Sequence, residues 1–144
     1  MVSITRHEEF EVAHILPGHD RGCGRLHGHT YKIEVTVTGP RDNNKDWGMV
    51  LDFGYLKSAI KQNVPDHYFV YQKTDIIGQD IAKVLDKHNI KYIEYDFPTT
   101  AENMVGYFAK EIQSYINNVL ELKDIKVTNV KLWETTNSYA EWSE

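Results

Sequence analysis

Two segments near the N-terminus alternate apolar and polar residues, and this period of two constrains the fold more than any other feature. It covers residues 3–14 and 29–38. The positions on one parity are Phe10, Val12 and His14 in the first segment and His29, Tyr31, Ile33, Val35 and Val37 in the second. Because side chains of a strand point alternately to its two faces, both segments predict half-buried β-strands. The turn-forming residues 17–24 predict a loop that returns the chain antiparallel.

The rest of the chain predicts three helices and two further strands. A first helix begins after its N-cap Asp52, and a second covers residues 77–88. The longest helix follows residues 98–102, where a threonine and Glu102 have the spacing of a capping box. Residues 92–95 and 125–134 predict strands, and the last strand carries apolar residues on both parities, which suggests burial on both faces.

We therefore expect an α+β fold, with an antiparallel sheet and helices on one face. Residues 1–144 are expected to form a single domain, since 144 residues with 41% hydrophobic content suffice for one substantial core. Association of subunits would cover the second face of the sheet.

The composition narrows the choice of partner and compartment. The net charge of -5 gives no broad cationic surface, so we expect neither nucleic acid nor membrane as a partner, but a small molecule. We find no apolar run of about 18 residues and no signal-peptide pattern, which predicts a cytoplasmic protein. The single cysteine, Cys23, agrees with a reducing compartment.

Three histidines suggest a metal site. His27 and His29 are two residues apart, so both point to one face of a strand, and His14 lies on the apolar parity of the strand before. Three neutral imidazoles suit Zn²⁺ and leave a fourth position for water or substrate, as in catalytic sites. Alternatively, Cys23 is the fourth ligand of a closed, structural site. The flanking Arg21 and Arg25 would stabilise a free thiolate, which favours the catalytic interpretation.

Three acidic positions have both a functional and a structural interpretation. Asp66 and His67 are adjacent and could form a proton relay or simply a turn after a helix. Glu102 could serve only the capping box. Glu134 continues an apolar strand face, where a carboxylate needs hydrogen-bond donors, and a ligand with paired N–H groups would supply them.

Six segments, in order, resemble the 6-pyruvoyltetrahydropterin synthase and 6-carboxytetrahydropterin synthase family between Phe10 and Trp142. They are Phe10–His14, Cys23–Tyr31, Gly48–Phe53, Asp66–His67, Pro98–Asn103 and Trp133–Thr135. The resemblance implies a tunnelling fold, in which the sheets of three subunits join into a barrel and two trimers stack into a homohexamer. It also implies that active sites form between subunits.

The resemblance further implies roles for individual residues. His14, His27 and His29 would bind zinc, and Glu134, Glu102 and Thr100 would bind the substrate, 7,8-dihydroneopterin triphosphate. Cys23 would remove a side-chain proton as a thiolate, and His67, oriented by Asp66, would return or relay a proton. Arg21, Arg25 and Lys32 could contribute positive charge for the triphosphate, or could simply be solvated.

The three residues between Cys23 and His27 resemble the branch that forms 6-carboxy-5,6,7,8-tetrahydropterin, acetaldehyde and triphosphate on the path to queuosine and other 7-deazaguanine compounds. The alternatives are the pyruvoyl product or a zinc-stabilised pterin-binding module without catalysis. A zinc hydrolase ranks lower, because Thr30 and Tyr31 replace the Asp-His continuation of one common hydrolase motif. Residues 68–72 also depart from the Leu-Asn pair that relatives show after the relay.

Overall fold

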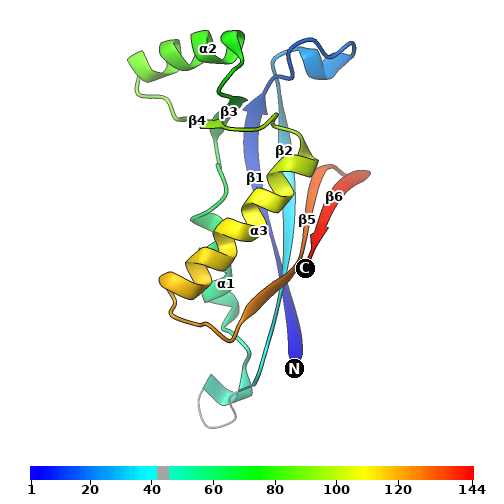
Figure 1. The fold of residues 1–144 in the computed structure, drawn as a ribbon, viewed down its shortest axis with the longest axis vertical. Coiled ribbons are helices and arrows are strands. Elements are labelled where there is room, and N and C mark those ends of the chain that lie inside the picture. The colour runs from blue at the N-terminus through cyan, green and yellow to red at the C-terminus, as the bar shows by residue number, and fades with distance from the viewer. Residues whose placement is uncertain (42–45) are drawn as a thin grey trace.

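The computed structural model describes residues 1–41 and 46–144, which form one six-stranded sheet with three helices (Figure 1). The elements are β1 (Val2–His14), β2 (His27–Gly39), α1 (Phe53–Lys61), β3 (Tyr68–Gln72), α2 (Ile76–Lys87), β4 (Tyr92–Tyr95), α3 (Ala101–Asn118), β5 (Lys126–Thr135) and β6 (Ser138–Ser143). Short 3₁₀ turns occur at Gly22–Gly24 and Asp46–Gly48. The strand order is β4-β3-β1-β2-β5-β6, and the predicted α+β class is confirmed.

The long strands β1, β2 and β5, with the short edge strand β6, form the expected antiparallel part of the sheet. β1 and β2 pair along their whole length, from Val2 opposite Gly39 to His14 opposite His27. β2 begins two residues earlier than the pattern predicted, so His27 as well as His29 lies in the strand. β5 and β6 extend the sheet antiparallel beyond β2.

β3 and β4 form an edge that departs from the expected antiparallel sheet. β3 pairs parallel to both β1 and β4. The sequence analysis missed β3 because its apolar residues are continuous and show no period of two. Val70 joins the main core, whereas Phe69 and Tyr71 pack in a second cluster with Ala82 of α2. Burial on both faces is typical of strands with parallel neighbours.

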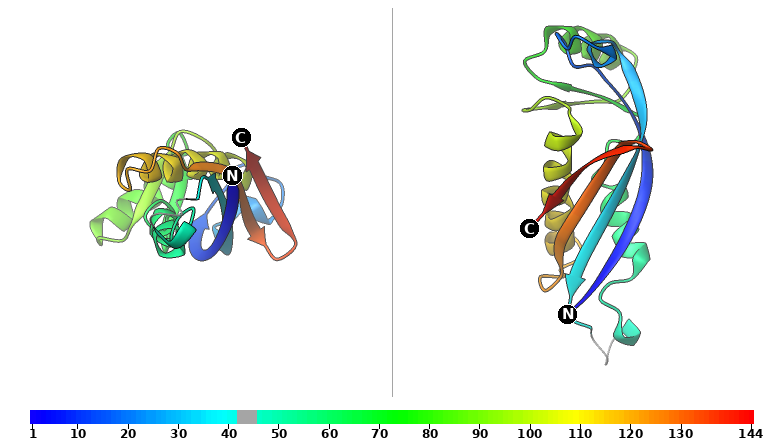
Figure 2. Two further views of the ribbon diagram at one scale, coloured as in Figure 1. Left: turned by 90° about the horizontal axis from the view of Figure 1, so that it is seen from below. Right: turned by 90° about the vertical axis from the view of Figure 1, so that its right-hand side faces the viewer.

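The helices lie on both faces, not on one. α1 and α3 cover the long strands from one side, as Figure 2 shows in the view turned about the vertical axis. α2 packs on the opposite face of β3 and β4. Its buried residues are Gly78 and Ala82, whereas Ile77 and Val84 of the predicted apolar face are 51% and 59% exposed. A Cβ at Gly78 would collide with the ring of Tyr71, so small residues set this contact.

The main core lies between the long strands and the helices α1 and α3. Its largest fully buried side chains are Tyr31, Phe10, Phe108, Ile33, Leu56, Ile60, Met104, Ile112, Ile116 and Leu132. α1 begins where predicted, because Oδ1 of Asp52 accepts a hydrogen bond from the amide of Gly54 at 2.6 Å. Within the described residues we find no helix long and apolar enough to cross a membrane.

The other face of the long strands is polar and open in the single chain, and its expected cover by neighbouring subunits stays a prediction. A β-bulge adds Thr128 to β5, and Val127 and Val130 therefore both face the core although their positions differ in parity. On the open face, hydroxyl groups pair across strands, for example Thr5 with Thr36 at 2.7 Å. A polar surface of this kind is compatible with water, as is common for antiparallel sheets.

Candidate metal centre

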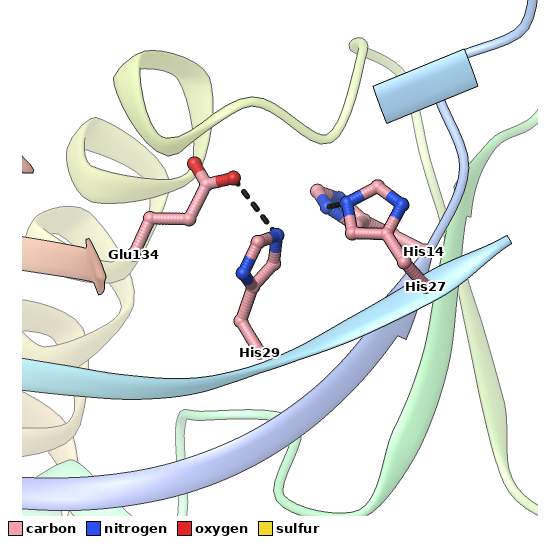
Figure 3. Close-up of side chains that lie close together, drawn as sticks. All are labelled: His14, His27, His29 and Glu134. Carbon is pink, nitrogen blue, oxygen red and sulfur yellow. Dashed lines mark hydrogen bonds and ion pairs between the residues drawn. The ribbon is translucent and has the colours of Figure 1, made fainter. Parts of the chain in front are cut away.

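Three histidines and one glutamate converge at one end of the long strands (Figure 3). His14 ends β1, and His27 and His29 begin β2. Glu134 lies near the end of β5. One potential ligand atom from each residue lies within 4.8 Å of the others. The sheet therefore assembles the three predicted zinc ligands and adds a carboxylate to them.

Backbone carbonyl groups fix the orientation of two imidazoles. Nδ1 of His14 lies 2.9 Å from the carbonyl oxygen of Thr99, and Nδ1 of His27 lies 2.6 Å from that of Arg25. Since a carbonyl group only accepts hydrogen bonds, each Nδ1 must carry the proton. In the neutral ring, Nε2 is then a lone-pair atom.

The two Nε2 atoms face each other at 3.0 Å. Two lone pairs at this distance repel each other unless a cation lies between them, either a proton or a metal ion. A hydrogen bond between the rings would require one His to be charged or to give up its carbonyl partner. The arrangement, with Nδ1 bound to an outer partner and Nε2 directed inward, is typical of metal-ligating histidines.

His29 completes the donor set. Its Nε2 atom is buried and has no hydrogen-bond partner among the described residues, although Oε1 of Glu134 lies 2.9 Å away. The site therefore offers two imidazole nitrogens with uncommitted lone pairs, those of His14 and His27, together with the imidazole of His29 and an adjacent carboxylate. Nitrogen and oxygen donors in this number suit zinc, and the residues present fit such an ion.

The electrostatic environment keeps the imidazoles neutral, as metal binding requires. Burial lowers the pKa of His14 to about 4, and the charge of the neighbouring His27 lowers it further. The hydrogen bond with Thr99 acts in the opposite direction and raises this pKa. Burial also lowers the pKa of His29, although the charge of Glu134 opposes the shift. Both rings are therefore ready to bind a cation at neutral pH.

The metal-free protein should lose stability as the pH falls from 7 to 5. The unfolded chain protonates His14 below about 6.5, whereas the folded chain does so only near 4, so protons favour unfolding in this window. For His14 alone we expect a loss of about 2 kcal/mol at pH 5. Urea unfolding in the presence of a chelator measures it.

A His14→Gln variant isolates this contribution, because it should show a smaller loss between pH 7 and pH 5 than the unmodified chain. His88→Gln is the matched control, since His88 is exposed. Equal pH dependence in all three proteins would contradict a neutral, buried His14.

A second β-bulge lies at Glu134, whose side chain points toward the histidines. β5 has one residue more than β6 at this position, which leaves Glu134 without a direct partner in β6. On the opposite face, Nε1 of Trp133 donates to Oε2 of Glu34 at 2.7 Å, and Nζ of Lys32 lies 4.7 Å from the Trp133 ring centroid. Lys32 thus points away from the histidines, which removes it as a triphosphate ligand in the same chain.

Cys23 lies next to the centre but outside its ligand set. The 3₁₀ turn Gly22–Gly24 carries it, and its carbonyl oxygen accepts a hydrogen bond from the amide of Leu16 at 2.9 Å. Burial raises the pKa of the Tyr31 hydroxyl, and the charges of Glu134 and Cys23 act in the same direction. Cys23 is therefore within electrostatic reach of the centre. Among the described residues, the group that could hold a metal does not include it, which does not favour the closed Cys-His site.

Asp66 and His67 form the predicted pair, beside Glu11 of β1. Oδ1 of Asp66 accepts hydrogen bonds from the amide of Glu11 and from Nδ1 of His67, both at 2.9 Å. The amide of Glu11 is the main cause of the lowered pKa of Asp66, and His67 adds to it. The His67 side chain is 77% exposed. In the described part of the chain, no hydrogen bond or ion pair joins this pair to Cys23.

The loop before α3 differs from the expected capping box. Thr100 is the N-cap and accepts from the amide of Asn103 at 3.4 Å, so Asn103, not Glu102, occupies the third helical position. Glu102 is exposed and lines a separate cavity of about 580 Å³ with the aromatic residues Tyr95 and Tyr107. Thr100 lies closer to the centre, immediately after the residue that holds His14.

Thr99 is the functional residue that the sequence analysis missed. It is 1% exposed, and both its carbonyl oxygen and its hydroxyl oxygen approach Nδ1 of His14, at 2.9 and 3.2 Å. Every residue has a carbonyl group, so no side-chain pattern could reveal this role. The only sequence signal was its position beside Thr100 in a segment that resembles the family.

Comparison with known proteins agrees with the fold. The chain matches the 6-pyruvoyl tetrahydropterin synthase family over residues 3–144. It is 37% identical over 148 residues to a 6-carboxy-5,6,7,8-tetrahydropterin synthase of Haemophilus influenzae, with 100% of both chains covered. A relative of the same name from Rickettsia bellii is 33% identical over 145 residues, covering 98% of this chain and 99% of the relative.

The fold is also that of solved members of this family. The crystal structure of 6-pyruvoyl tetrahydropterin synthase from Plasmodium vivax superposes with a TM-score of 0.72 at 15% identity, covering 99% of this chain and 97% of that one. The expected tunnelling fold is thereby confirmed for the subunit. Fold, sequence match and the three converging histidines lead to one conclusion: the chain belongs to the 6-pyruvoyl tetrahydropterin synthase family.

Proposed function

We propose that the protein is a zinc-dependent lyase that converts 7,8-dihydroneopterin triphosphate to 6-carboxy-5,6,7,8-tetrahydropterin, acetaldehyde and triphosphate, in the biosynthesis of queuosine or another 7-deazaguanine compound. The observation that carries the zinc requirement is the pair of Nε2 atoms of His14 and His27, which face each other at 3.0 Å. The names of full-length relatives support the reaction and the product.

Zinc held by His14, His27 and His29 would act as a Lewis acid toward the oxygen atoms of the substrate side chain and acidify the adjacent C–H bonds. The protein supplies the remaining functions. Cys23, as a thiolate, takes the proton from carbon. Because His67 donates its Nδ1 proton to Asp66, its Nε2 carries the lone pair and would relay a proton by first accepting one and then passing it on.

We assign Glu134 to the ring of the substrate and not to the metal. Its carboxylate is an acceptor for the amino and ring N–H groups of a pterin, and such charge-assisted hydrogen bonds are among the strongest in proteins. A zinc ion bound to Nε2 of His29 would use the lone pair of that nitrogen. Glu134, now 2.9 Å from this atom, would then be available to the ligand.

Replacement of Glu134 by alanine should raise KM about tenfold to a hundredfold, since one charged hydrogen-bonding partner of the substrate is lost. Zinc content should stay at the level of the unmodified protein. Steady-state kinetics and metal analysis of Glu134→Ala test this, with Glu141→Ala on β6 as the control. Loss of zinc would make Glu134 a metal ligand, and an unchanged KM with reduced folding stability would make it structural.

Among the described residues, the Asp66–His67 pair makes no hydrogen bond or ion pair with the histidine centre or with Cys23, and this bears on assembly. We propose that this pair acts in the site of a neighbouring subunit, and that the protein is a homohexamer built as a dimer of trimers. The open polar face of the long strands would then line the barrel. Native mass spectrometry measures the number of subunits, and a monomer with full activity would contradict this assembly.

Mass spectrometry of the products formed from 7,8-dihydroneopterin triphosphate tests the reaction. 6-Carboxy-5,6,7,8-tetrahydropterin with acetaldehyde supports the proposal. The pyruvoyl product would place the protein on the other branch of the family. Unchanged substrate, with zinc bound and the subunits assembled, would contradict catalysis and favour a pterin-binding module.

A further inference from the structure

The hydroxyl group of Tyr31 has no role in the function proposed above. Tyr31 is 0% exposed, and among the described residues its hydroxyl has no hydrogen-bond partner. Burying an unpaired hydroxyl is costly, and each such group in a native structure calls for an explanation. A phenylalanine would fill the same space without that cost, so the hydroxyl itself is the feature to explain.

The surroundings of Tyr31 hold its ring in one place beside the metal centre. The ring stacks on Phe10, with centroids 5.4 Å apart and an angle of 15° between the planes. The rings of His29 and His14 contact it edgewise, at 5.4 and 6.4 Å between centroids. Little side-chain entropy remains to be lost if this hydroxyl takes up a partner.

The register of the sheet places Tyr31 next to Glu134. The pairing of β2 with β5 ends at Lys32 and Trp133, and continuing it by one position would set Tyr31 opposite Glu134. Side chains directly opposite each other on one face start about 4.5–5.5 Å apart at Cβ. The charge of Glu134 also contributes more than that of Cys23 to the raised pKa of this hydroxyl, which agrees with close proximity.

Glu134 lacks a hydrogen-bond donor of its own. Its carboxylate is only 26% exposed, and its contact with His29 lies outside hydrogen-bond geometry. No other hydrogen bond to this carboxylate occurs among the residues that the structure describes. Among the described residues, the buried Tyr31 hydroxyl is thus a donor without an acceptor. The half-buried Glu134 carboxylate on the neighbouring strand is an acceptor without a donor.

We propose that Tyr31 is a positioning residue for Glu134: its hydroxyl donates a hydrogen bond to one carboxylate oxygen when His29 binds the metal. The other oxygen and the remaining lone pairs then stay directed at the N–H groups of the ligand. This inference rests on the proposed role of Glu134. It adds a residue that sets how tightly an N–H-bearing heterocycle is held, without contact between that residue and the ligand.

The test compares Tyr31→Phe with the unmodified, zinc-loaded protein in the binding of 7,8-dihydroneopterin, followed by fluorescence, and in the kinetics of the triphosphate substrate. The dissociation constant and KM should both rise about tenfold, while kcat and zinc affinity stay within a factor of two or so. Stability should be unchanged or higher, because the lost hydroxyl had no partner.

Tyr71→Phe is the matched control. Tyr71 is 3% exposed and its hydroxyl donates to Glu94 at 2.9 Å, so this variant also removes a tyrosine hydroxyl beside a glutamate, but in the cluster under α2. It should lower stability and leave pterin binding unchanged. A loss of stability in Tyr71→Phe without one in Tyr31→Phe separates positioning from packing.

A double-mutant cycle decides whether Tyr31 acts through Glu134. In a Glu134→Ala background, Tyr31→Phe should have no further effect on the dissociation constant. Equal effects in both backgrounds, or no effect in the unmodified chain, would overturn the inference. Failure of the unmodified protein to bind any pterin would instead refute the proposed function, so the two failures are distinguishable.

Discussion

The His27→Ala variant is expected to lose both bound zinc and turnover. His27 contributes one of the two Nε2 atoms that face each other at 3.0 Å, and its Nδ1 is already bound to the carbonyl oxygen of Arg25. Without it, two imidazoles remain, and zinc sites need three or four protein ligands. We expect zinc affinity to fall by more than the ~100-fold that is typical when only an outer hydrogen-bond partner is removed.

Metal analysis after dialysis, combined with turnover, measures this effect. His7→Ala is the control, because His7 lies on the same sheet but is exposed and distant in register from the centre. It should retain zinc and activity. Stoichiometric zinc in His27→Ala would contradict the three-histidine centre.

The Cys23→Ala variant, unlike His27→Ala, should separate zinc binding from catalysis. We expect it to retain zinc and to lose turnover. All three histidines remain, but the group proposed to remove the proton is gone, which costs about a hundredfold to ten-thousandfold in rate. Arg25 follows Cys23 in the same short turn, so circular dichroism and the zinc content must show that the turn still supports His27. Loss of zinc in this variant would revive the closed site with one cysteine.

Mixed oligomers extend this experiment to the subunit boundary. If Cys23 and His67 of one site come from different subunits, then mixing inactive Cys23→Ala and His67→Ala chains should restore part of the activity. Sites built within one chain would stay inactive in every mixture. Restored activity would show that one active site uses Cys23 and His67 from different subunits. Within one chain, Cys23 lies in the turn Gly22–Gly24, whereas His67 is paired with Asp66.

Periodicity predicted the elements whose contacts are local. The spacing of apolar residues and the N-cap residues predicted α1 and α3. The period of two in a strand predicted that His27 and His29 point to the same face. β3 was not recognised because its apolar run shows no period and its partners are distant in sequence. β6 was missed because it is a short edge strand with mixed composition.

The centre was predictable in its ligands but not in its outer partners. Imidazoles are rare enough for their spacing to carry information, and so His14, His27 and His29 could be found. The carbonyl oxygens of Thr99 and Arg25 could not, because backbone groups leave no trace in the sequence. The parity of β5 showed that Glu134 faces the core, and the structure shows that its carboxylate reaches Nε2 of His29.

The most direct test of the account is the zinc dependence of turnover in the unmodified protein. Purified protein is stripped with a chelator, and product formation from 7,8-dihydroneopterin triphosphate is followed as zinc is added back. The account predicts no product without metal and a return of full activity at one zinc per chain. Full turnover by the metal-free protein would contradict it, because His14, His27 and His29 would then have no catalytic purpose.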